Sequence, residues 1–231
     1  MKRLIVIISL LIVISESFGQ GCLPEGKTFS AQAQIDNFSA IYPGCTEIQG
    51  NVLIGGSGNN LTNLNGLSVL TSIGGNLQIS YLNGIPDLSG LQNLESIGGY
   101  LIIQTNASLQ SLNGLDNLTF IGRMLSVSGN DLLSNLNALG NLTTIGEYLD
   151  IYSNQNLIDL SGLDNIDYLP GSLGVYYNEN LQSLHGLEGL AETGGRVYIA
   201  DCPQLMSLSG LDNLQKIGNY LELYNNESLH D

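Results

Sequence analysis

The sequence predicts a mainly β fold, a short right-handed parallel β-solenoid of about eight leucine-rich rungs of 24 residues with an N-terminal capping helix. Three observations carry this prediction. Six segments of 24 residues follow one another without a gap from residue 74 to residue 217. Aliphatic residues recur at fixed positions in every segment, and a glycine begins most of them. Self-similarity at a fixed period of this length is typical of solenoids, whose units stack only on their neighbours.

The spacing of the aliphatic residues predicts one strand in each unit. With residue 74 counted as position 1, positions 4, 6, 12, 15, 18, 21 and 24 are aliphatic in all six units, Thr193 excepted. The alternation around positions 3 to 7 is typical of a strand. Glycines at positions 1 and 17 of most units are expected to form corners with positive φ. With a looser unit at 49–73 and a truncated one from Gly218, the solenoid should span residues 49–231.

Position 9 of the unit predicts a ladder of buried polar side chains. A buried asparagine there can hydrogen-bond the turn backbone of its own rung and of the next. Cys202 shares this position, so we interpret it as a buried thiol within the ladder. An intermolecular bridge is the alternative, because an odd cysteine in an exported protein often has an outside partner. The predicted ladder consists of Asn106, Asn130, Asn154, Asn178, Cys202 and Asn226.

Residues 1–19 have the features of a secretory signal peptide. Lys2 and Arg3 precede an almost wholly apolar run from residue 4 to residue 14. This run is too short to span a bilayer as a helix. A lipoprotein signal at Cys22 is the alternative, but no aliphatic residue stands three positions upstream. We therefore expect a secreted or cell-surface protein whose mature chain does not insert into a membrane.

Residues 20–48 depart from the repeat and predict an N-terminal cap with a helix over about 30–42. Ser30 is a candidate N-cap. Ile35, Phe38 and either Ile41 or Tyr42 fall on one helical face, which would cover the open end of the first rung. The Pro-Gly pair at 43–44 should end the helix.

Cys22 and Cys45 flank this predicted helix. In an oxidising compartment, a disulfide between them would pin the cap to the solenoid.

The cap and the rungs together resemble the receptor L domain. The segment "CTEIQGNVLI" (45–54) and rungs of the form "GLxxLxxIGGxLxI" carry the resemblance, which covers about residues 22–231. This domain is the ligand-binding module of the insulin and epidermal growth factor receptors and also occurs in bacterial secreted proteins, the type that this chain resembles. The resemblance implies a binding scaffold rather than receptor signalling, and it implies the pairing of Cys22 with Cys45.

Composition argues against several classes of function. The formal net charge of −15 would repel nucleic acid, so no nucleic-acid partner is expected. Two histidines and six basic residues leave little material for a catalytic triad, so we expect neither an enzyme nor a cofactor. Asp116, Asp164 and Asp212 recur at position 19, but one carboxylate per rung coordinates calcium poorly. We interpret these aspartates as turn caps and expect no metal site.

Outward positions 3, 5 and 7 of the strand predict a ligand-binding face. Seven of the 11 tyrosines fall on these positions. Tyrosine offers a rigid amphipathic ring at low entropic cost, which favours docking of a protein or a glycan. Stacking of the rings along the ladder is the competing interpretation, and a structural or adhesive module of a larger surface protein is the alternative function. The predicted face comprises Tyr100, Tyr148, Asp150, Tyr152, Tyr176, Tyr198, Tyr220, Glu222 and Tyr224.

The sequence stops at position 14 of the eighth rung without a recognisable cap. An unpaired sheet edge invites association. This edge therefore predicts self-association, unless the sequence is a fragment and a further segment covers the edge.

Overall fold

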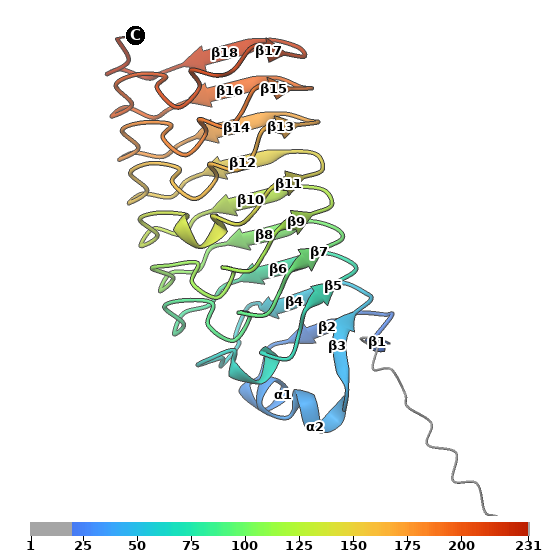
Figure 1. The fold of residues 1–231 in the computed structure, drawn as a ribbon. Helices are drawn as coiled ribbons and strands as arrows, with labels where there is room; N and C mark the ends of the chain where they lie inside the picture. The colour runs from blue at the N-terminus through green and yellow to red at the C-terminus, as the bar shows by residue number, and fades with distance from the viewer. Residues whose placement is uncertain (1–19, 231) are drawn as a thin grey trace, which may run out of the picture.

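The structure, a computed structural model, describes residues 20–230 and confirms the predicted fold class. Parallel strands stack into a β-solenoid of about eight turns (Figure 1). The predicted signal peptide lies outside the described residues. Within residues 20–230, no helix is long and apolar enough to cross a membrane.

One nine-stranded parallel sheet runs along the whole solenoid in the order β18-β16-β14-β12-β10-β8-β6-β4-β2. From β6 onward each strand occupies positions 4 to 7 of its unit, and each residue pairs with its counterpart 24 residues away, as Leu149 does with Leu173. The strands are β2 (Lys27–Phe29), β4 (Val52–Gly55), β6 (Leu77–Ser80), β8 (Leu101–Gln104), β10 (Leu125–Ser128), β12 (Leu149–Tyr152), β14 (Leu173–Tyr176), β16 (Val197–Ala200) and β18 (Leu221–Tyr224).

A second column of mostly two-residue strands at positions 23 and 24 is divided into two sheets. The six-stranded sheet contains β1 (Gln20–Cys22), β3 (Cys45–Ile48), β5 (Ser72–Ile73), β7 (Ser96–Ile97), β9 (Phe120–Ile121) and β11 (Thr144–Ile145). The three-stranded sheet contains β13 (Tyr168–Leu169), β15 (Glu192–Thr193) and β17 (Lys216–Ile217).

Pro170 explains the division between these two sheets. In the other rungs the residue at position 1 donates its N–H to the preceding rung, as Gly146 does to the carbonyl oxygen of Ile121 at 2.9 Å. Proline has no N–H to donate. The equivalent bond to Ile145 is therefore missing, and the ladder ends between β11 and β13.

The core consists of the aliphatic residues that the repeat predicted. From the first full unit to residue 205, the residues at positions 4, 6, 12, 15, 18, 21 and 24 are buried in one continuous cluster. Thr193, the exception in the pattern, is also buried, and its hydroxyl lies 3.3 Å from the carbonyl oxygen of Gly195 as a donor. The one polar substitution in the core is thus satisfied locally.

Position 17 forms the predicted corner. Five glycines there have φ between 105° and 112°: Gly90, Gly114, Gly162, Gly186 and Gly210. A Cβ on Gly114 would lie 2.1 Å from the carbonyl oxygen of Leu88, so both φ and space require glycine. Where Ala138 occupies position 17, the short 3₁₀ helix η2 (Asn137–Leu139) replaces the corner. A second such helix, η1 (Asn65–Leu67), lies in the looser first unit.

The corner predicted at position 1 is wrong, because none of the glycines there has positive φ. They permit close approach instead, since a Cβ on Gly98 would lie 2.3 Å from the carbonyl oxygen of Gly74. The second left-handed residue is at position 8, directly after each strand. It is mostly not glycine: Tyr81, Thr105, Gly129, Ser153, Tyr177, Asp201 and Asn225 all have φ between 49° and 64°.

The single helix predicted over about 30–42 is replaced by two short helices at the N-terminal end of the solenoid (Figure 1). These are α1 (Gln32–Asp36) and α2 (Phe38–Ile41). The break is at Asn37, whose backbone N–H and side-chain amide both donate to the carbonyl oxygen of Ala33, at 3.2 and 2.8 Å. A side chain that competes for backbone groups in this way interrupts a helix.

The start of the first helix also differs from the prediction. The N-cap is Ala31 rather than Ser30, and the Gln34 side chain accepts the N–H of Ser30 at 2.8 Å and that of Ala31 at 3.0 Å. Ile35 and Phe38 are buried as predicted, whereas Ile41 is 58% exposed. Tyr42 is the residue that packs against the core.

The predicted disulfide joins Cys22 on β1 to Cys45 on β3, with the two Cα atoms 5.7 Å apart. Strand β1 pairs with β3, and β2 pairs with β4. The parallel ladders therefore already include residues 20–22 and 27–29, upstream of the two helices.

Candidate ligand-binding face

Side chains at positions 3, 5 and 7 share the outer face of the nine-stranded sheet, because they alternate with buried residues at positions 4 and 6. All nine residues predicted to bind ligand lie on or next to five strands of this sheet: β8, β12, β14, β16 and β18. Tyr148, Tyr220 and Tyr224 are 46%, 54% and 58% exposed. The other predicted tyrosines are half-buried.

Four tyrosines on or directly after β12, β14 and β16 are connected through Tyr176, and we call them the tyrosine cluster. The rings of Tyr152 and Tyr176 stack with their centroids 4.7 Å apart and their planes at 4°. Tyr198 tilts against Tyr176 at 5.5 Å. Tyr177, which the predicted set did not include, meets Tyr176 edge-on at 5.7 Å. The cluster joins three adjacent rungs into one aromatic surface.

A glycine beside the cluster makes room for a carboxylate. A Cβ on Gly174 would lie 2.3 Å from Oδ1 of Asp150 and 3.3 Å from Cε1 of Tyr176. The Asp150 carboxylate therefore lies over the bare backbone of β14, next to the Tyr176 ring. Burial raises the pKa of Asp150, with Arg196 opposing the shift. Burial, followed by the nearby Asp150, raises the pKa of Tyr176 to about 12.

Arg196 organises the C-terminal part of the face. Its guanidinium lies 4.8 Å from the centroid of the Tyr198 ring, and Nη1 lies 3.5 Å from Oε2 of Glu222. Its pKa is raised, with Tyr220 as the largest cause. Arg196 thereby links three of the predicted residues, Tyr198, Tyr220 and Glu222.

Tyr100 lies apart from the cluster, on the N-terminal side of the face. The guanidinium of Arg123 lies 4.8 Å from the centroid of its ring, and Arg123 Nε also contacts Glu147 Oε1 at 2.9 Å. Tyr148 and Tyr224 have no aromatic or cation–π contact among the described residues. The nine predicted residues thus divide into a connected group from β12 to β18 and these outlying tyrosines.

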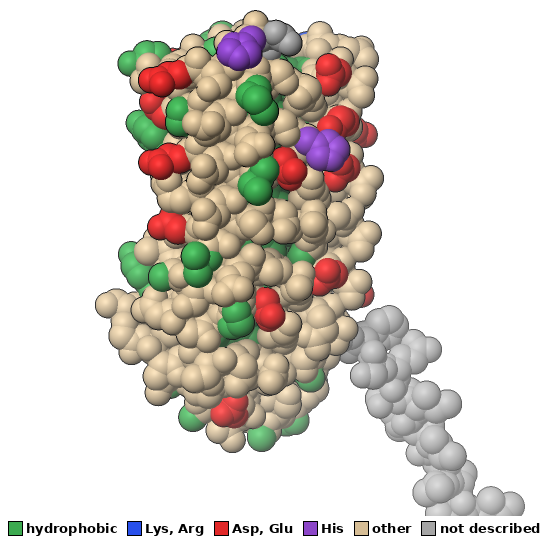
Figure 2. Space-filling view, turned by 90° about the vertical axis from the view of Figure 1, so that its left-hand side faces the viewer, with side chains coloured by type: hydrophobic (Ala, Val, Ile, Leu, Met, Phe, Trp, Pro, Cys, Tyr) green, Lys and Arg blue, Asp and Glu red, His purple; other side chains and the backbone are tan. Residues whose placement is uncertain are grey.

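A groove of about 580 Å³ borders the tyrosine cluster, at the corner where the strands end. It follows positions 8 and 10 of four rungs, and we call it the corner groove. Its lining contains three carboxylates and no lysine or arginine: Ser153, Gln155, Tyr177, Glu179, Asp201, Pro203, Asn225 and Glu227. Acidic side chains lie at intervals along the loop side of the solenoid (Figure 2). The sequence prediction missed this groove, although acidic residues recur at position 10, as Asp131, Glu179 and Glu227.

The asparagine ladder at position 9 is buried from Asn106 to Asn178, and Asn226 at its end is partly exposed. Asn106 donates through Nδ2 to the carbonyl oxygen of Ile79 at 3.1 Å, and its Oδ1 accepts the N–H of Leu82 at 3.0 Å. Asn130 accepts the N–H of Asn106 at 3.2 Å in the same way. Each asparagine therefore ties its rung to the preceding one rather than to the next one, and Asn130 and Asn154 also donate to a carbonyl oxygen of their own rung, as predicted.

Cys202 lies within this ladder as a free, buried thiol. Its Sγ is 3.4 Å from the carbonyl oxygen of Ala200, and burial raises the pKa of the thiol to about 11. Its own N–H donates to Oδ1 of Asn226 at 3.1 Å. The N–H of Asn178 faces this sulfur, whereas the N–H groups of Asn106, Asn130 and Asn154 each donate to an asparagine Oδ1. Because sulfur is a weaker acceptor than an amide oxygen, the ladder is weakest at Cys202.

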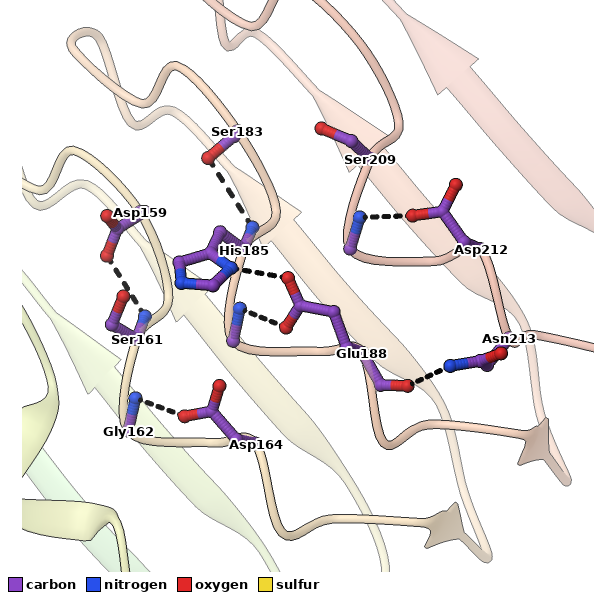
Figure 3. Close-up of polar contacts among 12 residues, drawn as sticks. Asp159, Ser161, Gly162, Asp164, Ser183, His185, Glu188, Ser209, Asp212 and Asn213 are labelled. Carbon is purple, nitrogen blue, oxygen red and sulfur yellow. Dashed lines mark hydrogen bonds and ion pairs between the residues drawn. The ribbon is translucent and has the colours of Figure 1, made fainter.

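The recurring aspartates at position 19 cap turns. Asp164 accepts the N–H of Gly162 and Asp212 that of Gly210, both at 3.0 Å (Figure 3). In the rung between them Glu188 accepts the N–H of Gly186 at 2.7 Å and also contacts Nδ1 of His185. The described residues contain no group of three or more metal-ligating side chains close enough to hold an ion.

An apolar pocket of about 480 Å³ lies at the C-terminal end of the solenoid. Leu211, Leu214 and Ile217 line it, together with Leu221, which is 47% exposed. These residues occupy positions that are fully buried in the preceding rungs. The surface is thus the one on which the predicted self-association would depend.

Comparison with known families supports the resemblance over part of the chain. A search among curated proteins and one among solved structures found no match. The segment of this chain that matches the receptor L domain ends before β12, so the tyrosine cluster lies outside that segment. Receptor L domains and β-solenoids are typically non-catalytic binding folds, and together with a disulfide they suggest an extracellular domain. Residues 71–132 of this chain match the family model of the receptor L domain.

Proposed function

We propose that this protein is a non-catalytic, secreted or cell-surface binding module that holds a protein or glycan on its tyrosine-bearing sheet face. The tyrosine cluster is the observation that carries this proposal. Three adjacent rungs place Tyr152, Tyr176 and Tyr198 in contact on an outer face, where the repeat itself demands no aromatic residue.

Ring stacking and ligand docking are compatible in this cluster. Stacking orders the rings before a partner arrives, so less side-chain entropy is lost on binding. The rings remain partly exposed, and Tyr177 is 53% exposed. Stable interfaces concentrate their binding energy in ordered aromatic residues of this kind.

A structural or adhesive module is the alternative function. The stacking of Tyr152 on Tyr176 supports it, because rings that stack along the ladder stabilise the solenoid without any ligand. In that case the tyrosine cluster would contribute only to stability.

The double substitution Tyr152→Ser/Tyr176→Ser tests the proposal. Tyr168→Ser is the matched control, because Tyr168 is 46% exposed on β13, outside the tyrosine face. Wild type and both variants are applied to an array of glycans and an array of extracellular proteins, after circular dichroism has verified that each is folded. The proposal expects binding that the double variant loses and the control keeps. A double variant that is less stable but retains every interaction would contradict the proposal and favour the structural or adhesive function.

A further inference from the structure

We infer that the partner of this face is a protein with a basic segment, which lies in the corner groove and seats one lysine or arginine at Asp150 against the tyrosine rings. This inference rests on the proposed function and specifies the chemistry of the partner.

The Asp150 carboxylate favours a positively charged ligand. No side chain among the described residues donates a hydrogen bond to its carboxylate, which lies half-buried over Gly174. Arg196, the basic residue on this part of the face, is engaged with Tyr198 and Glu222. Arg196 lowers the pKa of Asp150 but forms no ion pair with it among the described residues. A ligand cation in direct contact would therefore stabilise this half-buried carboxylate further.

The tyrosine rings strengthen the preference for a cation. Ring faces attract ammonium and guanidinium groups, and more strongly when the site is partly desolvated. Tyr176 lies directly beside the Asp150 carboxylate, with Tyr152 stacked on one side and Tyr198 on the other. Arg196 over Tyr198 is an example of this contact within the protein itself.

The corner groove extends the same charge preference across further rungs. Tyr177 lines the groove and touches Tyr176, so the groove and the cluster form one surface. Glu179 and Glu227 are exposed and make no side-chain hydrogen bond among the described residues, whereas Asp201 accepts one from Asn225 at 2.9 Å. Two carboxylates are therefore available to a ligand along the groove.

The period of the solenoid suggests the shape of the basic segment. Glu179 and Glu227 lie two rungs apart, or about 9.6 Å for strands about 4.8 Å apart. A polyproline II helix repeats after three residues, or about 9.3 Å. Basic residues three positions apart in such an extended segment would meet the two glutamates in register.

The test uses a short labelled peptide with two lysines three residues apart for the two glutamates and a third lysine for Asp150, and a second peptide with glutamates in place of the lysines. Fluorescence anisotropy reports binding to the wild type and to Asp150→Asn and Glu179→Gln/Glu227→Gln variants. Glu95→Gln/Asp167→Asn is the charge-matched control, because both residues are exposed at position 22, away from the groove. We expect the lysine peptide alone to bind, each site variant to weaken it by about tenfold, and the control to change it by less than about twofold.

Equal weakening in the site and control variants would overturn the inference, because general charge attraction would then explain the binding. Preference for the glutamate peptide would also overturn it. If the glycan array yields a ligand that depends on Tyr152 and Tyr176 while the lysine peptide fails, the proposed function stands and this inference falls. If the lysine peptide still binds the Tyr152→Ser/Tyr176→Ser variant, the tyrosine cluster and the corner groove do not form one binding surface. That result would overturn this inference and argue against the proposed function.

Discussion

The two halves of the nine-stranded sheet have the same interior and different exteriors. Positions 4 and 6 are buried aliphatic residues in β6 and β8 as well as in β12 and β14. Outside, β6 carries Gln78 and Ser80, whereas β12 carries Asp150 and Tyr152. The receptor L domain match covers β6, β8 and β10 and ends before β12.

This difference separates what the repeat requires from what it permits. A rung must bury its aliphatic residues against both neighbours, so the inner positions cannot vary without loss of packing. The side chains at the outer positions do not enter the core, although small ones such as Ser80 and Ala200 are covered by their neighbours, so these positions can vary without loss of the inner packing. A group of tyrosines restricted to three rungs is therefore informative about function in a way that the leucines are not.

The largest change in the free energy of unfolding should come from a substitution in the interior, and it should be similar in both halves of the sheet. Leu101→Ala and Leu173→Ala each remove a fully buried side chain at position 4. Each should lower the free energy of unfolding by about 2–5 kcal/mol, measured by urea denaturation. Losses that differ by more than about 2 kcal/mol would contradict the equivalence of the two interiors.

The disulfide should stabilise the N-terminal end alone. Cys22→Ala/Cys45→Ala removes a link across 23 residues of sequence, which should cost about 3 kcal/mol. Hydrogen exchange should show faster opening at β1 and β3 and unchanged protection at β14. A reducing agent should reproduce the effect in the wild type and leave the double variant unchanged; an effect of the agent on the variant would implicate another thiol.

Cys202→Asn should increase the stability of the C-terminal half of the solenoid, because it restores the asparagine ladder. An asparagine would present Oδ1 to the N–H of Asn178 and Nδ2 to the carbonyl oxygen of Val175, which lies 4.0 Å from the present sulfur. Net gains of about 1 kcal/mol are typical of an added hydrogen bond. Thermal unfolding of this variant beside Cys202→Ala gives the comparison, and equal or lower stability of Cys202→Asn would argue against a ladder defect.

The smallest effect should be the pH dependence contributed by Asp150. Because its folded-state pKa is raised above the unfolded value, ionisation costs the folded state stability as pH rises from about 3.9 through the folded pKa. Asp150→Asn should therefore be slightly more stable than wild type near neutral pH, and this gain should vanish below about pH 3.9. Urea denaturation across that range measures it; a gain that grows at low pH would contradict the assigned shift.

Much of the fold was predictable from the sequence because the period is explicit. The sequence predicts the inner leucines, the ladder with Cys202 and the Cys22–Cys45 pair, and the structure contains all three, although Asn226 is only partly buried. The nine candidate binding residues were also predicted to share one face. Local spacing suffices for the leucines, the ladder and the face, since inward and outward positions alternate along a strand. The cysteine pair instead followed from its place on either side of the cap and from the resemblance to the receptor L domain.

Other features depended on contacts between residues one rung apart. The residue in the left-handed corner at Tyr177 is not a glycine, so the sequence does not predict the corner. The break in the second ladder follows from the missing N–H of Pro170. The split helix depends on a side-chain bond from Asn37.

The sequence by itself determined the period, the interior and the outward direction of the tyrosines, because these depend only on alternation within one rung. Tertiary structure alone decided which outer residues form a site. Asp150 acquires its half-buried place because residue 174, one rung later, is a glycine, and Tyr176 joins the corner groove through Tyr177. Such neighbours are 24 residues apart in sequence and only one strand apart in space, so stacking determines the chemistry of the face.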